Sequence, residues 1–210
     1  MELLKIVIFV IQLMWLSRLI NYLKEKQVFS AMKKRLQSLY NFFYKAYWVN
    51  CSEKKQGQQV WKLLKKWFLN ENLRHGVYEN ESTIACRYEI TENTVFEFRY
   101  SVSEHAFHCR SYICESYDAE ATTNLFILAT HFNSILRTGK VIINPENQTI
   151  QYTFNRSIAD IIFNNSIIDS SIVNHFDTTK DVFWAFDKLL REDEEPSIII
   201  ADLLRMKEGN

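Results

Sequence analysis

The chain has very little glycine and proline, 4 and 2 among 210 residues. This scarcity excludes glycine-rich phosphate-binding loops, collagen-like repeats and proline-rich recognition segments. No GxGxxG, Walker A, HExxH, GxSxG or CxxC spacing occurs anywhere in the sequence. We therefore expect a protein that is not an enzyme and that holds no cofactor and no metal.

The residues that most often carry chemistry are also poorly placed for it. The cysteines lack metal-ligand spacing and predict free thiols, at Cys51, Cys86, Cys109 and Cys114. His105, His108 and Cys109 would converge on a helix, but their segment alternates as a strand, which turns His108 away from the other two. No serine lies in a nucleophile elbow, and we expect no histidine to serve one. Glu97 with Glu89 or Glu115 indicates solvated charges opposite arginines rather than a catalytic carboxylate pair.

The zero net charge hides an uneven distribution. Residues 1–70 hold 13 basic and 3 acidic residues, whereas residues 71–210 hold 12 basic and 22 acidic ones. A basic segment of this kind suits anionic lipid, nucleic acid or the chain's own acidic part. Its basic residues alternate with large aliphatic side chains and no nucleic-acid-binding motif accompanies them, so we expect no nucleic-acid partner.

Residues 3–20 are strongly apolar. Their charge-free run, residues 6–17, has only 12 residues, fewer than the roughly 20 that cross a membrane. Because Lys5 and Arg18 flank the run and extend toward head groups, we predict a membrane-inserted or interfacial helix that contacts the membrane through Phe9, Trp15 and Arg18. A cleaved signal peptide fits less well, since no small-residue cleavage site follows. Burial of this helix against the rest of the chain or a partner stays open.

Residues 29–48 predict an amphipathic helix. One apolar face is formed at helical spacing by Phe29, Met32, Leu36, Leu39, Phe43 and Tyr47. Lys33, Lys34 and Arg35 lie mostly on the other faces, which suits an anionic membrane surface. An amphipathic helix packed on a domain fits the pattern almost as well. Basic residues follow the apolar stretch, so the positive-inside bias leaves the rest of the chain in the cytoplasm.

Residues 58–210 predict an α+β domain, joined by a linker at residues 49–57 to a helical appendage over residues 1–48. The expected helices cover residues 58–70, 125–136 and 166–191, the last either continuous or broken near Asp177. The expected strands cover residues 84–90, 96–102, 107–113, 141–143 and 150–154. A short element is expected over residues 198–204. The order α-β-β-β-α-β-β-α indicates an antiparallel sheet with helices packed on it and one solvent-exposed face.

This order resembles the type III secretion chaperone-like fold, in particular its YbjN-like branch. The local match is Asn133-x-x-x-x-x-Gly139 at a helix end, a strand over residues 140–144, an acidic turn at Glu146 and a tyrosine-bearing strand over residues 150–154. The resemblance covers residues 58–191, although the turn lacks the glycine that usually follows the acidic residue and residues 1–48 have no counterpart. It implies a bacterial protein-binding module, either a chaperone that dimerises and holds extended partner segments or a regulator. The pattern includes no catalytic or ligand residues.

The exposed face of the predicted sheet is therefore the expected partner-binding surface, with Arg87, Glu89, Glu97, Arg99, His108, Arg110 and Tyr112. We expect a protein partner, an extended peptide segment that adds to a sheet edge, or a second copy in a homodimer. The expected location is the cytoplasmic face of the bacterial inner membrane, or the cytoplasm. The alternative is a small-molecule-binding or enzymatic α+β domain with a pocket between sheet and helices.

Overall fold

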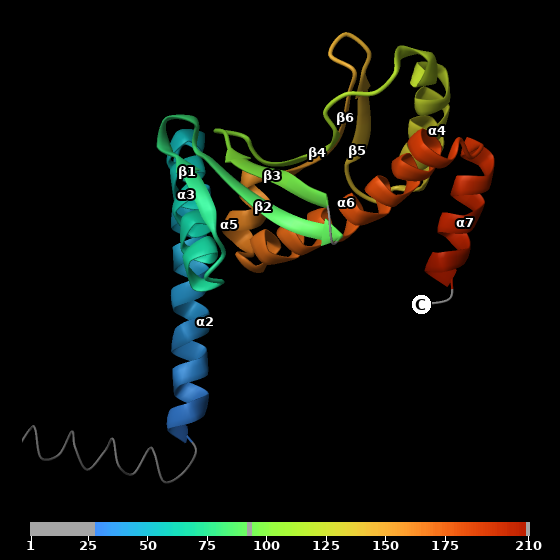
Figure 1. The fold of residues 1–210 in the computed structure, drawn as a ribbon. Helices are drawn as coiled ribbons and strands as arrows, with labels where there is room; N and C mark the ends of the chain where they lie inside the picture. Colours follow the sequence, from blue (N-terminus) through green and yellow to red (C-terminus); the bar gives the residue numbers. More distant parts are fainter. Residues whose placement is uncertain (1–27, 92–93, 209–210) are drawn as a thin grey trace, which may run out of the picture. The chain divides into compact units, whose positions relative to one another are not determined.

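The computed structural model describes residues 28–91 and 94–208, which belong to two compact units, residues 1–50 and residues 51–210 (Figure 1). The helix predicted over residues 3–20 lies outside the described residues. In the first unit, helix α2 (Val28–Val49) confirms the amphipathic helix. Its apolar side chains are 40% to 66% exposed at Met32, Leu36, Leu39 and Phe43.

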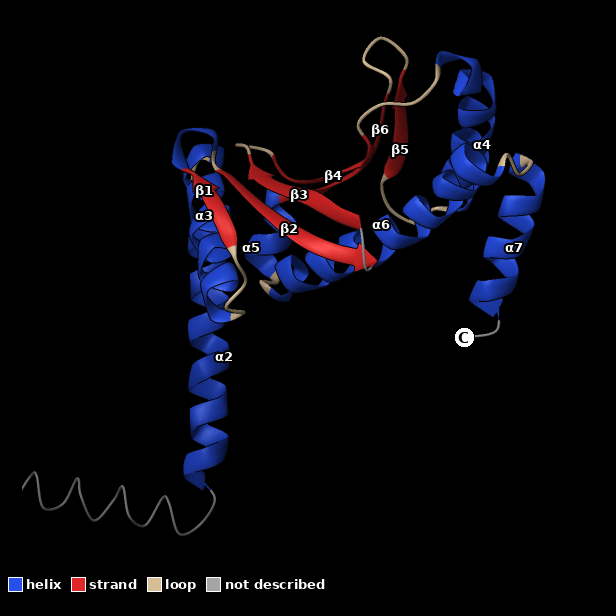
Figure 2. Ribbon diagram, in the orientation of Figure 1, coloured by secondary structure: helices blue, strands red, loops and turns tan. Residues whose placement is uncertain are grey.

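The second unit is an α+β domain built on one six-stranded antiparallel sheet (Figure 2), which confirms the predicted fold class. Its strands are β1 (His75–Tyr78), β2 (Thr83–Thr91), β3 (Thr94–Val102), β4 (Ala106–Cys114), β5 (Lys140–Asn144) and β6 (Thr149–Ser157). Its helices are α3 (Glu53–Asn70), α4 (Thr122–Ile135), α5 (Ile158–Phe163), α6 (Ser166–Glu192) and α7 (Pro196–Glu208), with 3₁₀ turns η1 (Glu79–Glu81) and η2 (Ala119–Ala121). The strands lie in the order β1-β2-β3-β4-β6-β5.

Alternation along the strands gives the sheet one apolar and one polar face. On β3, Phe96, Phe98 and Tyr100 are buried, while the residues between them are not. β4 and β6 follow the same period of two, as a half-buried strand does. Helices α3 and α6 cover the apolar face, where Phe68 of α3 meets Tyr100 and Phe183 of α6 meets Phe96. The core of the domain therefore lies between this face and the helices.

His175 of α6 is fully buried in this core and is surrounded by rings. Its ring lies about 5.5 Å, between centroids, from each of the rings of Phe98, Tyr100, Tyr152 and Phe154. Its Nδ1 atom lies 3.4 Å from the Tyr100 hydroxyl. Burial lowers the pKa of His175 to about 3, partly offset by a main-chain hydrogen bond with Tyr152. The imidazole is therefore neutral at physiological pH and acts as a core residue.

The motif of Asn133 and Gly139 closes one edge of the sheet. The Asn133 side chain accepts a hydrogen bond from the Val141 main-chain N–H at 2.7 Å and donates one to the Val141 carbonyl at 3.0 Å. It thus takes the place of a further strand beside β5. Gly139 turns the chain into β5 with φ of +79°, and a Cβ there would lie 2.7 Å from the Phe154 Cβ and the Thr153 carbonyl. Only glycine fits this conformation and this approach.

Several elements differ from the prediction. The linker is shorter, since α3 begins at Glu53. Strand β1 is not among the expected strands, because its four residues include Gly76 and show no alternation of burial. Helix α6 runs without a break at Asp177, and its buried face continues through His175, Thr179 and Val182. The predicted tail element is the longer helix α7.

Candidate functional site

The predicted partner-binding residues all lie on the polar face of the sheet. Strands β2, β3 and β4 are neighbours, and every second residue on each of them points away from the helices. We define the polar face by Arg87, Glu89, Glu97, Arg99, His108, Arg110 and Tyr112 together with Lys140 of β5. The structure thus brings together side chains from segments more than twenty residues apart, as the alternation predicts.

Register places charged residues directly across from one another on this face. Arg87 lies opposite Glu97, and Arg99 lies opposite Arg110. The Glu97 carboxylate accepts a hydrogen bond from Arg99 at 2.6 Å and one from Arg87 at 3.4 Å. The hydrogen bond from Arg99 and the weaker contact with Arg87 hold the pKa of the Glu97 carboxyl below its usual value. Glu97 is therefore an ionised partner of two arginines, which agrees with the solvated charge pairing that we predicted.

His108 makes contacts that the sequence did not indicate. Its Nδ1 atom lies 2.9 Å from Oδ1 of Asn155, and its Nε2 atom lies 3.1 Å from the Ser103 hydroxyl. A histidine therefore does contact a serine, contrary to the expectation that none is placed beside one. Ser103 and Asn155 belong to different segments, and the pairing of β4 with β6 joins them. The Ser103 hydroxyl also accepts a hydrogen bond from the Ala106 main-chain N–H and donates one to the Ala106 carbonyl, both at 3.1 Å, so it closes the β3–β4 turn as well.

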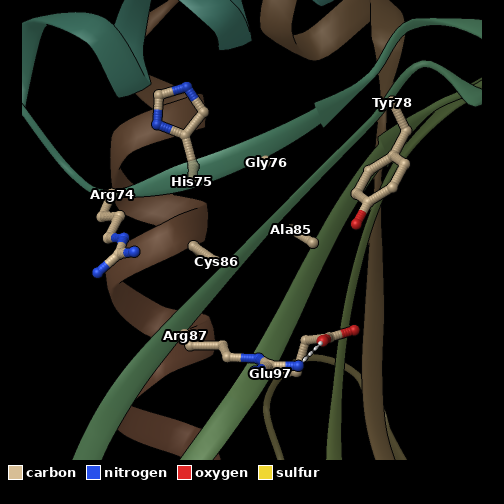
Figure 3. A pocket seen from close by; sticks show the side chains of 8 residues that line it. All are labelled: Arg74, His75, Gly76, Tyr78, Ala85, Cys86, Arg87 and Glu97. Atoms are coloured by element: carbon tan, nitrogen blue, oxygen red, sulfur yellow. Dashed lines mark hydrogen bonds and ion pairs between the residues drawn. The ribbon is translucent and has the colours of Figure 1, made fainter.

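A hollow of about 550 Å³ lies along β1 and the neighbouring part of β2 (Figure 3). Arg87 and Glu97 from the polar face form part of its lining and are joined to each other there. The remaining lining residues are Arg74, His75, Gly76, Tyr78, Ala85 and Cys86. Sequence reasoning missed those at positions 74–78, because they depend on the unpredicted strand β1.

The two outer edges of the sheet are unlike each other. At the β5 edge, the Asn133 side chain forms hydrogen bonds with the main-chain N–H and carbonyl of Val141. At the other edge, β1 pairs with residues 83–86 of β2, while β2 continues to Thr91. Among residues 28–91 and 94–208, no strand lies beside residues 87–91 of β2 on that side. An edge with unpaired main-chain groups is a template for a further strand.

A second hollow, of about 460 Å³, lies between the end of β4 and helix α6. Its walls include Ile113, Phe183 and Leu190, with Asp118 and Asp187 among its acidic residues. Asp187 forms an ion pair with Arg191 at 2.8 Å, and the Asp118 carboxylate accepts a hydrogen bond from the Glu120 main-chain N–H. The alternative function, a small-molecule-binding or enzymatic domain, requires a pocket of this kind between the sheet and the helices. Here, however, both carboxylates already bind groups of the chain itself.

The cysteines carry no sign of reactivity. All four are free thiols. Cys86 and Cys109 are buried on the apolar face, and burial raises the pKa of Cys86 to about 12 and that of Cys109 well above its usual value. His108 lies on the opposite face from Cys109, as predicted. No group of three or more His, Cys, Asp or Glu residues in the described part of the chain is arranged to hold a metal ion.

Three of the predicted membrane contacts, Phe9, Trp15 and Arg18, lie outside the described residues. Lys33, Lys34 and Arg35 lie on α2 and are exposed. Within residues 28–91 and 94–208, no helix combines the length and the apolar character that crossing a membrane requires.

Comparison with known proteins identifies no family for this chain. No family model matches it, and no curated protein matches it. Among solved structures, the type III secretion chaperone SycH of Yersinia pestis, in complex with a stable fragment of YscM2, is similar over 57% of this chain and 98% of that chain, with 11% identity and a TM-score of 0.35. The YbjN-like branch remains a resemblance of the sequence alone.

Proposed function

We propose that residues 51–210 are a non-enzymatic protein-interaction module that presents the polar face to a partner protein. The observation that carries this proposal is the open polar face, which places eight charged or hydrogen-bonding side chains from four strands on one surface. Arg87, Arg99 and Arg110 are exposed and Tyr112 is half-buried, and arginine and tyrosine are enriched at protein interfaces relative to the rest of the surface.

The open edge of β2 supports an extended segment as the bound form of the partner. Arg87, the first residue of this open stretch, lines the hollow of Figure 3, and residues 87–91 continue β2 beyond its pairing with β1. A segment added there would pair with β2 through main-chain hydrogen bonds and place alternate side chains on the polar face. A second copy of this chain is one such partner, and sedimentation velocity of the full chain reports whether a homodimer forms.

Helix α2 supports attachment of the module to an anionic membrane surface. It contains four basic residues and no acidic one, and its apolar side chains are exposed. Amphipathic helices of this composition bind in the interface, with basic side chains on anionic head groups. The location that we propose is the cytoplasmic face of the bacterial inner membrane.

The interaction face is tested by site-specific photocrosslinking in cells. A benzoylphenylalanine in place of Tyr112 is expected to form adducts with a partner protein, because that position lies at the centre of the polar face. The matched control places the same group at Asn174, which is exposed on α6 on the opposite side of the sheet. Equal adducts at both positions, or none at position 112, would refute the proposed face.

A second candidate function, ester or amide hydrolysis, is favoured by one observation. The His108 ring lies between the Ser103 hydroxyl and the Asn155 side chain. This is the arrangement of a nucleophile, a base and a group that orients the base. The full chain and the variants S103A and H108N are assayed with p-nitrophenyl acetate. On the proposed interaction function, both variants hydrolyse the ester as slowly as the full chain does. A rate above the uncatalysed rate that both variants lose would overturn that proposal in favour of an enzyme.

A further inference from the structure

A row of cationic side chains crosses the strands of the polar face. Arg99 of β3 lies directly opposite Arg110 of β4, Arg110 lies opposite Thr153 of β6, and Thr153 lies opposite Lys140 of β5. All of these residues point away from the apolar face, so one row across four strands holds three cations. We propose that this row binds carboxylates of an acidic protein segment, an inference that rests on the interaction function proposed above.

Like charges directly opposite on neighbouring strands destabilise a sheet. Arg99 is compensated by Glu97, at 2.6 Å. Arg110 and Lys140 form no ion pair or side-chain hydrogen bond with any residue in ranges 28–91 and 94–208, and both are exposed. The charges of Arg110 and Lys140 thus have no counter-ion in these ranges, and a bound anion would supply one.

The spacing of the row fits carboxylates. Directly opposite residues on neighbouring strands lie roughly 5 Å apart, so Arg99 and Arg110 both reach one carboxylate, and planar guanidinium groups bind it through paired hydrogen bonds. Lys140 lies two strands beyond Arg110, about 10 Å away, which is within reach of a second carboxylate on the same segment. Tyr112, next but one to Arg110 on β4, lies at the side of this clamp.

The surrounding charges favour an acidic protein over a polyphosphate. Glu89 and Glu97 lie on the same face and would repel the continuous negative charge of a nucleic acid. A membrane is disfavoured as well, because the row is polar and lacks the exposed apolar side chains that α2 has. Residues 166–208, which comprise α6, α7 and the turn between them, are by contrast acidic, with ten acidic and five basic residues.

The test is fluorescence anisotropy with the full chain and a rhodamine-labelled peptide of four Glu-Ser repeats, at low ionic strength. Binding is expected for this peptide and not for the Gln-Ser peptide of the same length. The double variant R99Q/R110Q is expected to weaken binding about tenfold or more, since two charge-assisted contacts are lost. The matched control R191Q/R205Q removes two exposed arginines from α6 and α7 and is expected to leave binding unchanged.

Failure of this inference is distinguishable from failure of the proposed function. Absence of binding by the Glu-Ser peptide, or equal binding by R99Q/R110Q, would overturn the carboxylate site. Tighter, R99Q/R110Q-sensitive binding of a single-stranded RNA or of anionic vesicles would overturn it in favour of that class. The crosslink from position 112 reports separately on the proposed function. An adduct that persists in R99Q/R110Q would keep the interaction face and refute carboxylate recognition.

Discussion

Gly139 stands at the point where the chain leaves α4 and enters β5, and its conformation decides whether Asn133 meets Val141. An alanine there would adopt a positive φ and press its Cβ against Phe154 and the Thr153 carbonyl. We expect G139A to lower the free energy of unfolding by about 3 kcal/mol, from the left-handed backbone and the overpacking together. Urea unfolding followed by circular dichroism measures this change.

Gly76 is the matched control for Gly139. It lies in β1, its φ is not positive, and a Cβ there would come no closer than 3.6 Å to the Tyr78 ring. We expect G76A to change the free energy of unfolding by no more than about 0.5 kcal/mol. A loss in G139A as small as that in G76A would show that the turn into β5 differs from the one described.

His175 makes stability depend on pH. Burial lowers its pKa to about 3 in the folded chain, whereas an unfolded chain has the ordinary value of about 6.5. The unfolded state therefore takes up a proton as pH falls below about 6.5, while the folded state does so only near 3. Stability is thus lost across that window, and linkage gives a loss of about 2 kcal/mol between pH 7.5 and pH 5 from this residue.

The measurement is the free energy of unfolding as a function of pH, for the full chain and for H175Q. In H175Q, the loss of about 2 kcal/mol in the free energy of unfolding between pH 7.5 and pH 5 that His175 causes is expected to disappear. In H131Q, at an exposed position on α4, that loss is expected to remain. Should H175Q fail to fold, a proton NMR titration of the wild-type His175 ring gives the same information. A ring that titrates near pH 6.5 in the folded chain would contradict the burial described.

At the scale of the elements, a single side chain closes the β5 edge of the sheet. The Asn133 side chain satisfies two main-chain groups of β5. We expect N133A to lower the free energy of unfolding by about 1 to 2 kcal/mol, because the Val141 N–H and carbonyl lose their partners. Hydrogen exchange at the Val141 amide should also become faster, since this amide would open with the edge of the sheet.

N174A is the control for N133A, because it removes the same side chain from an exposed position on α6. We expect it to leave both stability and exchange at Val141 unchanged. If N133A and N174A had equal effects, the edge closure assigned to Asn133 would be disproved.

Much of the element pattern was predictable because alternation and helical spacing record burial directly. Phe96, Phe98 and Tyr100 alternate with polar residues, so β3 and its faces follow from the sequence. Strand β1 does not follow, because it is an edge strand whose stability comes from pairing with β2 and not from its own burial. The polar-face residues were predictable for the same reason as the strands, whereas Arg74 and Tyr78 were not, since they depend on β1.

The contact of Ser103 with His108 and Asn155 marks the limit of sequence reasoning at the site. Ser103 lies in the turn after β3, His108 lies in β4 and Asn155 lies in β6, so the β3–β4 hairpin and the pairing of β4 with β6 are both needed to bring them together. Sequence offers a weak signal for Ser103 alone, because serine is favoured in turns where its hydroxyl meets nearby main-chain groups. The like-charged pair of Arg99 and Arg110 likewise depends on register.

At the scale of the whole molecule, basic residues form two separate surfaces, for which we propose different functions. The described basic residues of α2 lie on an amphipathic helix, and a separate basic row crosses the polar face, while the helices α6 and α7 carry an excess of acid. On our proposals, α2 binds lipid and the polar face binds protein, so changes in one should leave the other intact. This independence is testable, because the two surfaces belong to different compact units.

We expect the full chain to bind vesicles that contain phosphatidylglycerol more tightly than vesicles of phosphatidylcholine alone. The variant K33Q/K34Q/R35Q should lose about 3 kcal/mol of this preference, at roughly 1 kcal/mol per basic residue near an anionic surface. The variant L36E/F43E should bind neither kind of vesicle well, because charges would replace exposed apolar side chains on the inserting face. Vesicle co-sedimentation measures both effects.

The control Q37E/N41E adds the same two charges on the polar side of α2 and keeps the apolar face intact. It should weaken binding to anionic vesicles and leave binding to neutral ones unchanged, which separates charge from insertion. All three α2 variants should still form the crosslink from position 112. Vesicle binding that none of these substitutions alters would remove α2 from the attachment, and loss of the crosslink in K33Q/K34Q/R35Q would show that the two surfaces act as one.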